Sequence, residues 1–239
     1  MTSTFLEIAL ASDELVASLQ YYRALGFAEL TTNDARDYAY AVVTDGRIVL
    51  GLHERSFDAP TLTLTQPDLA KHALTWSEDV ALRHMQIDPD SFHEVLLADP
   101  DDHPLLLVEA RTYSPATETL NQSLLGECVE WTYPVRQALI SARFWAPFAP
   151  RALQTREQPD LHLRFASGDL PVGLSEAIAG RTGQLCYQTA DLATLGQTAD
   201  KLGTPLRPAR TNLPDCDLQL ITPEGLIINI LSQDFLNAE

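Results

Sequence analysis

The sequence predicts an α+β fold of two tandem domains, each built from a pair of βαβββ modules. A shift of 123 residues brings residues of the same type together from the first predicted strand to the last, which indicates an internal repeat. A second repeat, of 54 residues, lies inside each half. The longer repeat matches Glu7 with Glu130, Ser18 with Ser141, Leu97 with Leu220 and Pro100 with Pro223, and after one deletion Gly51 with Gly173.

The first module shows the expected order of elements most clearly. Residues 5–10 read as a short apolar strand, and Ser12 opens a polar cap before a helix whose apolar residues recur at i, i+4 and i+7. Gly26 is expected just past the end of that helix. Strands at residues 28–32, 38–44 and 47–54 follow, and the dipeptide at 45–46 (DG) marks a hairpin turn.

The other modules repeat this order. In the second, a strand at residues 61–65 precedes a helix that starts after Asp68, and in the third Pro134 is expected near the start of a short or broken helix. The remaining predicted elements are strands at 82–87, 93–98 and 104–109, a helix at 192–202 and a last strand at 227–231. We expect a polar linker at residues 113–125 between domain 1 (residues 1–112) and domain 2 (residues 126–239).

Composition and charge limit the classes of partner. The chain has 16 Lys and Arg against 33 Asp and Glu, a net charge of −17, which argues against nucleic acid because phosphate contacts need basic side chains. The charge would either solubilise the surface or steer cationic ligands towards it. No run of about 18 apolar residues and no signal-peptide pattern is present, so we expect no membrane partner. Three scattered cysteines fit reduced thiols, and we expect a cytoplasmic monomer or homodimer.

Two stretches resemble recurring phrases of the vicinal-oxygen-chelate superfamily, which includes glyoxalases, bleomycin-resistance proteins and extradiol dioxygenases. One is the first helix, residues 18–27 (SLQYYRALGF), and the other is the turn before the last strand of domain 1, residues 99–105 (DPDDHPL). The resemblance implies that each module pair curls a mixed sheet around a cleft. It also implies that metal ligands, usually His, Gln or Glu, point inward from the first and last strand of each module.

Those ligand positions hold few metal donors in this chain. In domain 1 they fall on Glu7, on Leu50 or Gly51, and on Thr61 and Leu106. In domain 2 they fall on Glu130, on Val172 or Gly173, and on Gln184 and Asn229. A divalent ion needs about four donors, so neither set is expected to bind a metal tightly, and no cofactor is expected. A one-residue slip in two strands would instead gather Glu7, His53 and Glu109 into a divalent-metal site.

Glu7 and Glu130 are the sharpest candidates, since each carboxylate lies mid-strand among apolar residues at an equivalent position. We interpret them either as cleft carboxylates that contact a cationic ligand or as partners of an arginine. Further candidates for ligand binding are Gln184, Asn229, Trp131 and Tyr40, and the sequence assigns no catalytic residue.

The sequence therefore favours a metal-free small-molecule binding protein that resembles the bleomycin-resistance branch and holds a ligand in its cleft. Two alternatives stay open. One is a metal-dependent lyase or dioxygenase of the vicinal-oxygen-chelate type that uses Glu7, His53 and Glu109. The other is a degenerate scaffold without catalysis, which would be favoured if side chains fill the clefts.

Overall fold

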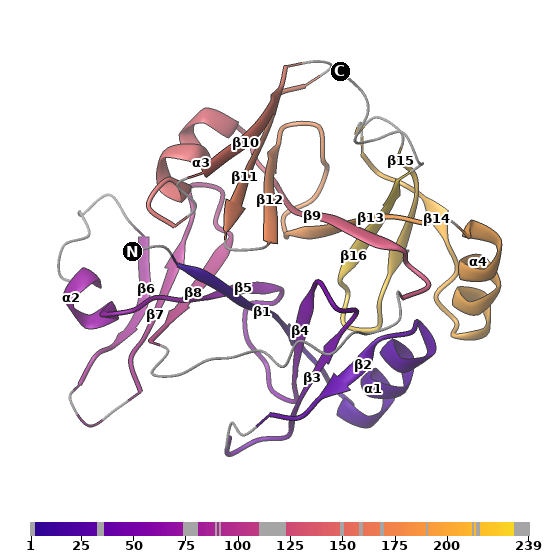
Figure 1. Cartoon of the computed structure of the whole chain (residues 1–239), viewed down its shortest axis with the longest axis horizontal. Helices are drawn as coiled ribbons and strands as arrows, with labels where there is room; N and C mark the ends of the chain where they lie inside the picture. The colour runs from indigo at the N-terminus through magenta and orange to yellow at the C-terminus, as the bar shows by residue number, and fades with distance from the viewer. Residues whose placement is uncertain are drawn as a thin grey trace.

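The computed structural model confirms two eight-stranded mixed sheets, one from each half of the chain (Figure 1). Figure 1 shows the N-terminal half in indigo and magenta and the C-terminal half in orange and yellow. The structure describes residues 3–32, 36–73, 81–88, 90, 92–109, 123–148, 151–157, 160–167, 170–189, 191–211, 213 and 216–231.

The first sheet has the strand order β2-β3-β4-β1-β5-β8-β7-β6. Its two modules meet where β1 pairs with β5 antiparallel, while β1 pairs with β4 and β5 with β8 in parallel. Its elements are β1 (Thr4–Ala11), α1 (Leu15–Ala24), β2 (Ala28–Leu30), β3 (Tyr40–Thr44), β4 (Val49–His53), β5 (Thr61–Thr65), α2 (Leu69–Ala73), β6 (Ala81–Gln86), β7 (Glu94–Ala98) and β8 (Pro104–Val108).

The second sheet repeats this topology as β10-β11-β12-β9-β13-β16-β15-β14, so the repeat read from the sequence is a structural repeat. Its elements are β9 (Glu127–Pro134), α3 (Ala138–Trp145), β10 (Arg151–Arg156), β11 (His162–Ser167), β12 (Leu170–Ser175), β13 (Gln184–Gln188), α4 (Leu192–Lys201), β14 (Arg207–Pro208), β15 (Cys216–Ile221) and β16 (Ile227–Leu231).

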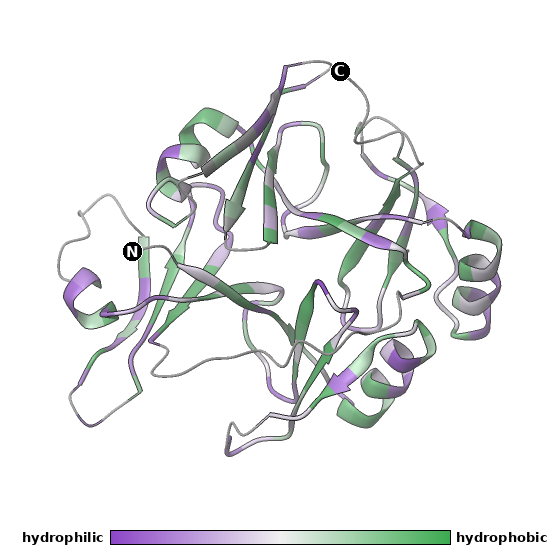
Figure 2. Ribbon diagram, viewed as in Figure 1, coloured by the Kyte–Doolittle hydropathy of each residue, from purple (hydrophilic) through white to green (hydrophobic). Residues whose placement is uncertain are grey.

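Strand alternation separates a core face from a cleft face in each sheet. On β1, Ile8 and Leu10 join the hydrophobic core, whereas Glu7 and Ala9 face a cavity on the other side. Figure 2 shows hydrophobic residues concentrated on central strands such as β4 and β8. The larger of two clusters of buried side chains runs through both domains, so the halves share this core, and the smaller cluster lies within domain 2.

Two equivalent hydrogen bonds join the domains. Ser18 on α1 donates to the carboxylate of Glu224 in the β15–β16 turn, and Ser141 on α3 donates to Asp101 Oδ2 in the β7–β8 turn at 2.9 Å. The 123-residue shift carries each bond onto the other, which makes the domain interface pseudo-symmetric.

Some local expectations are confirmed and others are wrong. Gly26 follows α1 with a φ of 92°, and Gly203 follows α4 with a φ of 75°, as helix-ending residues do. The polar segment before α1 makes no side-chain cap hydrogen bond, and Glu14 takes the cap position. Pro134 ends strand β9 and lies before helix α3.

The domain boundaries stay a prediction, because residues 113–122 of the expected linker lie outside the described residues. The end of that segment contacts domain 1, since Leu124 N donates to Leu25 O at 2.9 Å and Leu125 is fully buried. Within the described part of the chain, no helix is long and apolar enough to cross a membrane.

Candidate functional site

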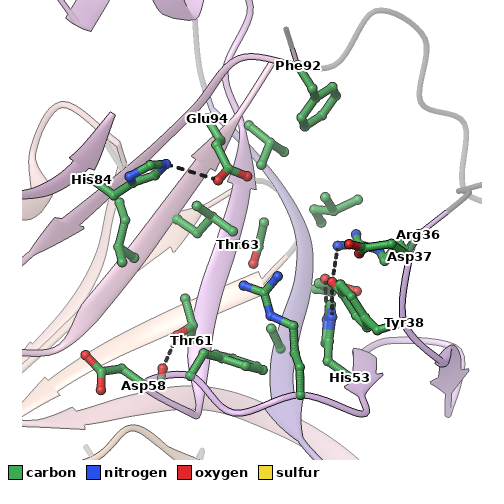
Figure 3. A pocket seen from close by; sticks show the side chains of 18 residues that line it. Arg36, Asp37, Tyr38, His53, Asp58, Thr61, Thr63, His84, Phe92 and Glu94 are labelled. Atoms are coloured by element: carbon green, nitrogen blue, oxygen red, sulfur yellow. Dashed lines mark hydrogen bonds and ion pairs between the residues drawn. The ribbon is translucent and has the colours of Figure 1, made fainter. Parts of the chain in front are cut away.

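A cavity of about 910 Å³ opens on the cleft face of the first sheet (Figure 3). Strands β1 and β5 contribute its floor, β6, β7 and β8 contribute one wall, and residues 36–38 together with the segment after β4 contribute its mouth. The two domains differ here, because the equivalent carboxylate of domain 2 pairs with a histidine and an arginine, as described below.

A chain of hydrogen bonds runs from Glu7 on the floor towards the mouth. His53 Nε2 lies 3.1 Å from Glu7 Oε1, and Tyr40 donates its hydroxyl to Glu7 Oε2 at 2.7 Å. On the other side of the imidazole, Tyr38 Oη lies 3.1 Å from His53 Nδ1. Both Glu7 and His53 are 4% exposed, so these contacts form away from bulk water.

The opposite wall of the cavity is mostly apolar with one polar pair. Leu96 and Leu106 project from β7 and β8, and His84 Nε2 lies 3.5 Å from Glu94 Oε1 (Figure 3). Thr63 on the floor is buried, and its hydroxyl has no hydrogen-bond partner among the described residues. Buried hydroxyls are normally paired, so this one is available to a bound molecule.

Two arginines lie at the mouth, against aromatic rings. The Arg36 guanidinium donates to Tyr38 Oη at 2.7 Å and lies 4.3 Å from the centre of the Tyr40 ring. The Arg55 guanidinium lies 5.0 Å from the Tyr38 ring and 5.6 Å from the Phe57 ring. These cation–π contacts hold positive charge over the entrance.

In domain 2 the equivalent carboxylate contacts three side chains of its own domain. Glu130 is fully buried, with His162 Nε2 at 3.1 Å from Oε1, Arg164 Nε at 3.2 Å from Oε2, and Thr132 donating to Oε1 at 2.6 Å. Burial alone would raise the pKa of Glu130, but the contacts with His162, Thr132 and Arg164 outweigh it and lower the pKa. Of the two interpretations of Glu130, the one that pairs it with an arginine agrees with these contacts.

Gln184 and Asn229 lie next to each other in the same sheet. Asn229 Nδ2 donates to Gln184 Oε1 at 2.8 Å, and Gln184 Nε2 donates to the Ala179 carbonyl at 2.9 Å. Both side chains are buried, and part of the donors and acceptors of each amide is already bonded to the protein.

Two of the residues expected in a cleft are placed elsewhere. Trp131 is fully buried in the hydrophobic core on the face of β9 opposite Glu130, so the expectation that it lines a cleft is wrong. Glu109 pairs with His93 and does not line the domain 1 cavity. His53 does lie beside Glu7, as the alternative metal site of Glu7, His53 and Glu109 required. Glu109, however, does not join these two side chains.

Sequence reasoning missed several residues of these clusters. His162 is not among the candidates from the sequence, yet it is 5% exposed and pairs with Glu130. Arg164, Tyr38, His84 and Glu94 were not singled out, because each makes its contact across neighbouring strands or loops and no short sequence spacing reveals it.

Comparison of the sequence with protein-family models and with curated proteins gives no match. Comparison of the structure gives matches over almost the whole chain. A catechol 2,3-dioxygenase matches with a TM-score of 0.59 and 13% identity over 97% of this chain and 88% of its own. A homoprotocatechuate 2,3-dioxygenase variant from Brevibacterium fuscum matches with a TM-score of 0.61 and 12% identity over 97% and 72%.

A homoprotocatechuate 2,3-dioxygenase from Arthrobacter globiformis matches with a TM-score of 0.57 and 14% identity over 98% of this chain and 80% of its own. The chain has the extradiol dioxygenase fold. This fold agrees with the fold implied by the resemblance of the first-helix and turn phrases. A shared fold does not fix an activity, so the activity must be argued from the side chains of the site.

The donors present do not fit a divalent metal at the positions that the extradiol dioxygenase fold implies. In domain 2 these positions hold one carboxylate, already neutralised by Arg164, and the Gln184–Asn229 amide pair. In domain 1 they hold Glu7 together with Gly51, Thr61 and Leu106. Among the described residues, no group of three or more His, Cys, Asp or Glu side chains is arranged to bind a metal ion.

Proposed function

We propose that this chain is a small-molecule binding protein that holds its ligand in the domain 1 cavity. The observation that carries the proposal is the cavity itself. Its volume of about 910 Å³ lies within the range of roughly 300–1,000 Å³ that ligand sites occupy, and it combines an apolar wall with a few convergent polar groups. The unpaired hydroxyl of Thr63 would donate to such a ligand or accept from it.

The contacts of the two carboxylates argue against a cation as the ligand. Glu130 is neutralised by Arg164, and Glu7 already accepts from Tyr40 and contacts His53. Arg36 and Arg55 lie at the mouth together with Asp37 and Asp58, so the entrance carries charges of both signs and does not favour a cation. We therefore propose a neutral ligand with an apolar body that packs on the wall formed by β7 and β8.

A ligand screen with a blocked cavity tests this proposal. A panel of neutral, anionic and cationic aromatic fragments is screened by saturation-transfer NMR against the wild type and two variants. Leu106→Trp would place an indole ring in the cavity against its apolar wall, and Leu192→Trp adds the same ring at an exposed site on α4 in domain 2. Neutral fragments should bind the wild type and Leu192→Trp, and should lose binding in Leu106→Trp. Fragments that bind all three proteins equally, or none, would contradict the proposal.

A further inference from the structure

The contacts between Tyr38, His53 and Glu7 fit one tautomer of a neutral imidazole, in which Nε2 carries the proton. An ionised carboxylate only accepts, so Glu7 takes one bond from the Tyr40 hydroxyl and one from N–H at His53 Nε2. The neutral imidazole then carries no proton on Nδ1, which accepts from the Tyr38 hydroxyl. Arg36 donates to the same phenolic oxygen from the other side.

This arrangement has the parts of an activated nucleophile. A hydroxyl lies within hydrogen-bond reach of a base, and the base is oriented by a buried carboxylate, which is the geometry that activates side-chain nucleophiles in covalent catalysis. The Arg36 guanidinium would stabilise the phenolate as its proton leaves. Tyr38 is half-buried and lines the cavity, so a bound molecule can reach its oxygen.

We propose that Tyr38 is a nucleophile that accepts the acyl group of an aryl ester or thioester bound in the domain 1 cavity. The inference rests on the proposed function in one respect, namely that the acyl donor occupies the same cavity. His53 serves as the general base, and Glu7 is a positioning residue that holds the imidazole in the required tautomer.

The reaction balances without any further reactant except water. Tyr38 Oη bonds to the carbonyl carbon while its proton moves to His53 Nδ1, and the carbonyl electron pair moves to oxygen. The intermediate then expels the phenolate or thiolate, which leaves with the proton from His53. Water next gives a proton to His53 Nδ1 and attacks the acyl-tyrosine. The carboxylic acid departs as Tyr38 recovers its proton from His53.

The chemistry of the nucleophile sets the class of substrate. A tyrosine hydroxyl has an ordinary pKa of about 10 and a thiol one of about 8.5, so an acyl group passes to Tyr38 without a large uphill step only from a leaving group of comparable acidity. Alkyl esters are therefore poor donors, whereas aryl esters and thioesters are suitable. The apolar wall at Leu96 and Leu106 would hold the acyl chain.

The probe for this reaction is p-nitrophenyl acetate, with release of nitrophenolate and peptide mapping by mass spectrometry as readouts. Background acylation at lysine and cysteine is limited in this chain, because it has two lysines, Lys71 and Lys201, and three buried cysteines. The variants are Tyr38→Phe, His53→Gln and the matched control Tyr21→Phe, whose hydroxyl bonds Thr204 at the domain interface, away from the cavity.

The wild type and Tyr21→Phe should acquire one acetyl group at Tyr38, and Tyr38→Phe should acquire none there. His53→Gln should slow the acetylation by about 100-fold or more, which is the usual contribution of a general base. Independently of any variant, Tyr38 should react faster than every other tyrosine of the native wild type and should lose that preference in urea.

Equal reactivity of all tyrosines in the native chain, or acetylation of Tyr38 that survives His53→Gln unchanged, would overturn the inference. Fragment binding that is lost in Leu106→Trp while Tyr38 does not react would overturn this inference alone. If no fragment binds the wild type and Tyr38 does not react, the proposed function is overturned as well.

Discussion

The carboxylate of Glu7 lies directly over Gly51 on the neighbouring strand, and a Cβ atom at Gly51 would overlap it. The repeat reproduces this relationship in domain 2, where a Cβ at Gly173 would come within 2.7 Å of Glu130 Oε1. In both halves, therefore, the position where the superfamily resemblance implied a metal ligand is a glycine that makes room for the carboxylate of the adjacent strand.

We predict that Gly173→Ala destabilises the fold more than Gly51→Ala, although the overlap at Gly51 is closer. Glu7 lines a cavity into which its carboxylate can move, whereas Glu130 is fully buried and held by Arg164. Gly173→Ala should cost about 1–3 kcal/mol of unfolding free energy, as overpacking usually does, and Gly51→Ala should cost less. Urea denaturation measures both, and the reverse order would show that Glu130 is free to move.

We predict that Glu130→Gln destabilises the free protein by about 3 kcal/mol at neutral pH, because it removes the carboxylate that pairs with the partly buried Arg164. Glu7→Gln is the matched variant and should cost less, because its hydrogen-bond partners are a phenol and an imidazole. Thermal and urea unfolding at pH 7 give the comparison. Equal losses of unfolding free energy in the two variants would show that the arginine makes no difference between the two carboxylates.

The cost of Glu130→Gln should also depend on pH. The pKa of Glu130 is lower in the folded state than its ordinary value of 4.5, so the carboxylate stabilises the fold above that pH and loses this contribution as pH falls towards its folded pKa. The difference between wild type and Glu130→Gln should therefore be constant above about pH 5 and should shrink in more acidic solution. A difference that stays constant down to pH 3 would show that the pKa is not lowered.

Elemental analysis of protein purified without a chelator should find well under one equivalent of iron, manganese, nickel or zinc. The reason is the donor set, in which Arg164 occupies one oxygen of Glu130 and two amides bond each other. His53→Ala should leave the metal content unchanged. Stoichiometric metal that disappears in His53→Ala would restore the alternative site with Glu7.

Ser18→Ala and Ser141→Ala should each lower the unfolding free energy by about 1 kcal/mol, since each removes one of the equivalent bonds between the domains. The unfolding should stay a single transition in both variants, because the two halves share one hydrophobic core. Fluorescence and circular dichroism followed in parallel test this. Transitions that separate by probe would show that the halves unfold independently.

The fold could be read from the sequence because its evidence is local or periodic. Gly26 and Gly203 end helices, and the last strand is the predicted one, Ile227–Leu231. The 123-residue repeat then fixed the order of the modules. The cap before α1 and the position of Pro134 were misread, because polar and proline residues mark the end of a strand as readily as the start of a helix.

The site could be predicted only in part, because the repeat conserves the carboxylates and not their partners. Tyr40 and His162 occupy equivalent positions at the start of β3 and β11, and His53 and Ser175 occupy equivalent positions opposite them. Each half therefore brings a histidine to its carboxylate, but from a different strand. Such pairing depends on the register across three strands, which residue spacing along the chain does not report.

The interface around Ser18 and Ser141 is one that a half-length chain could form with a second copy of itself, because each half supplies both the helix hydroxyl and the turn carboxylate. In such a homodimer every substitution would alter both clefts at once. Joined in one polypeptide, the two halves mutate separately. Domain 2 can thus pair its carboxylate with Arg164, while the equivalent carboxylate of domain 1 lines a cavity.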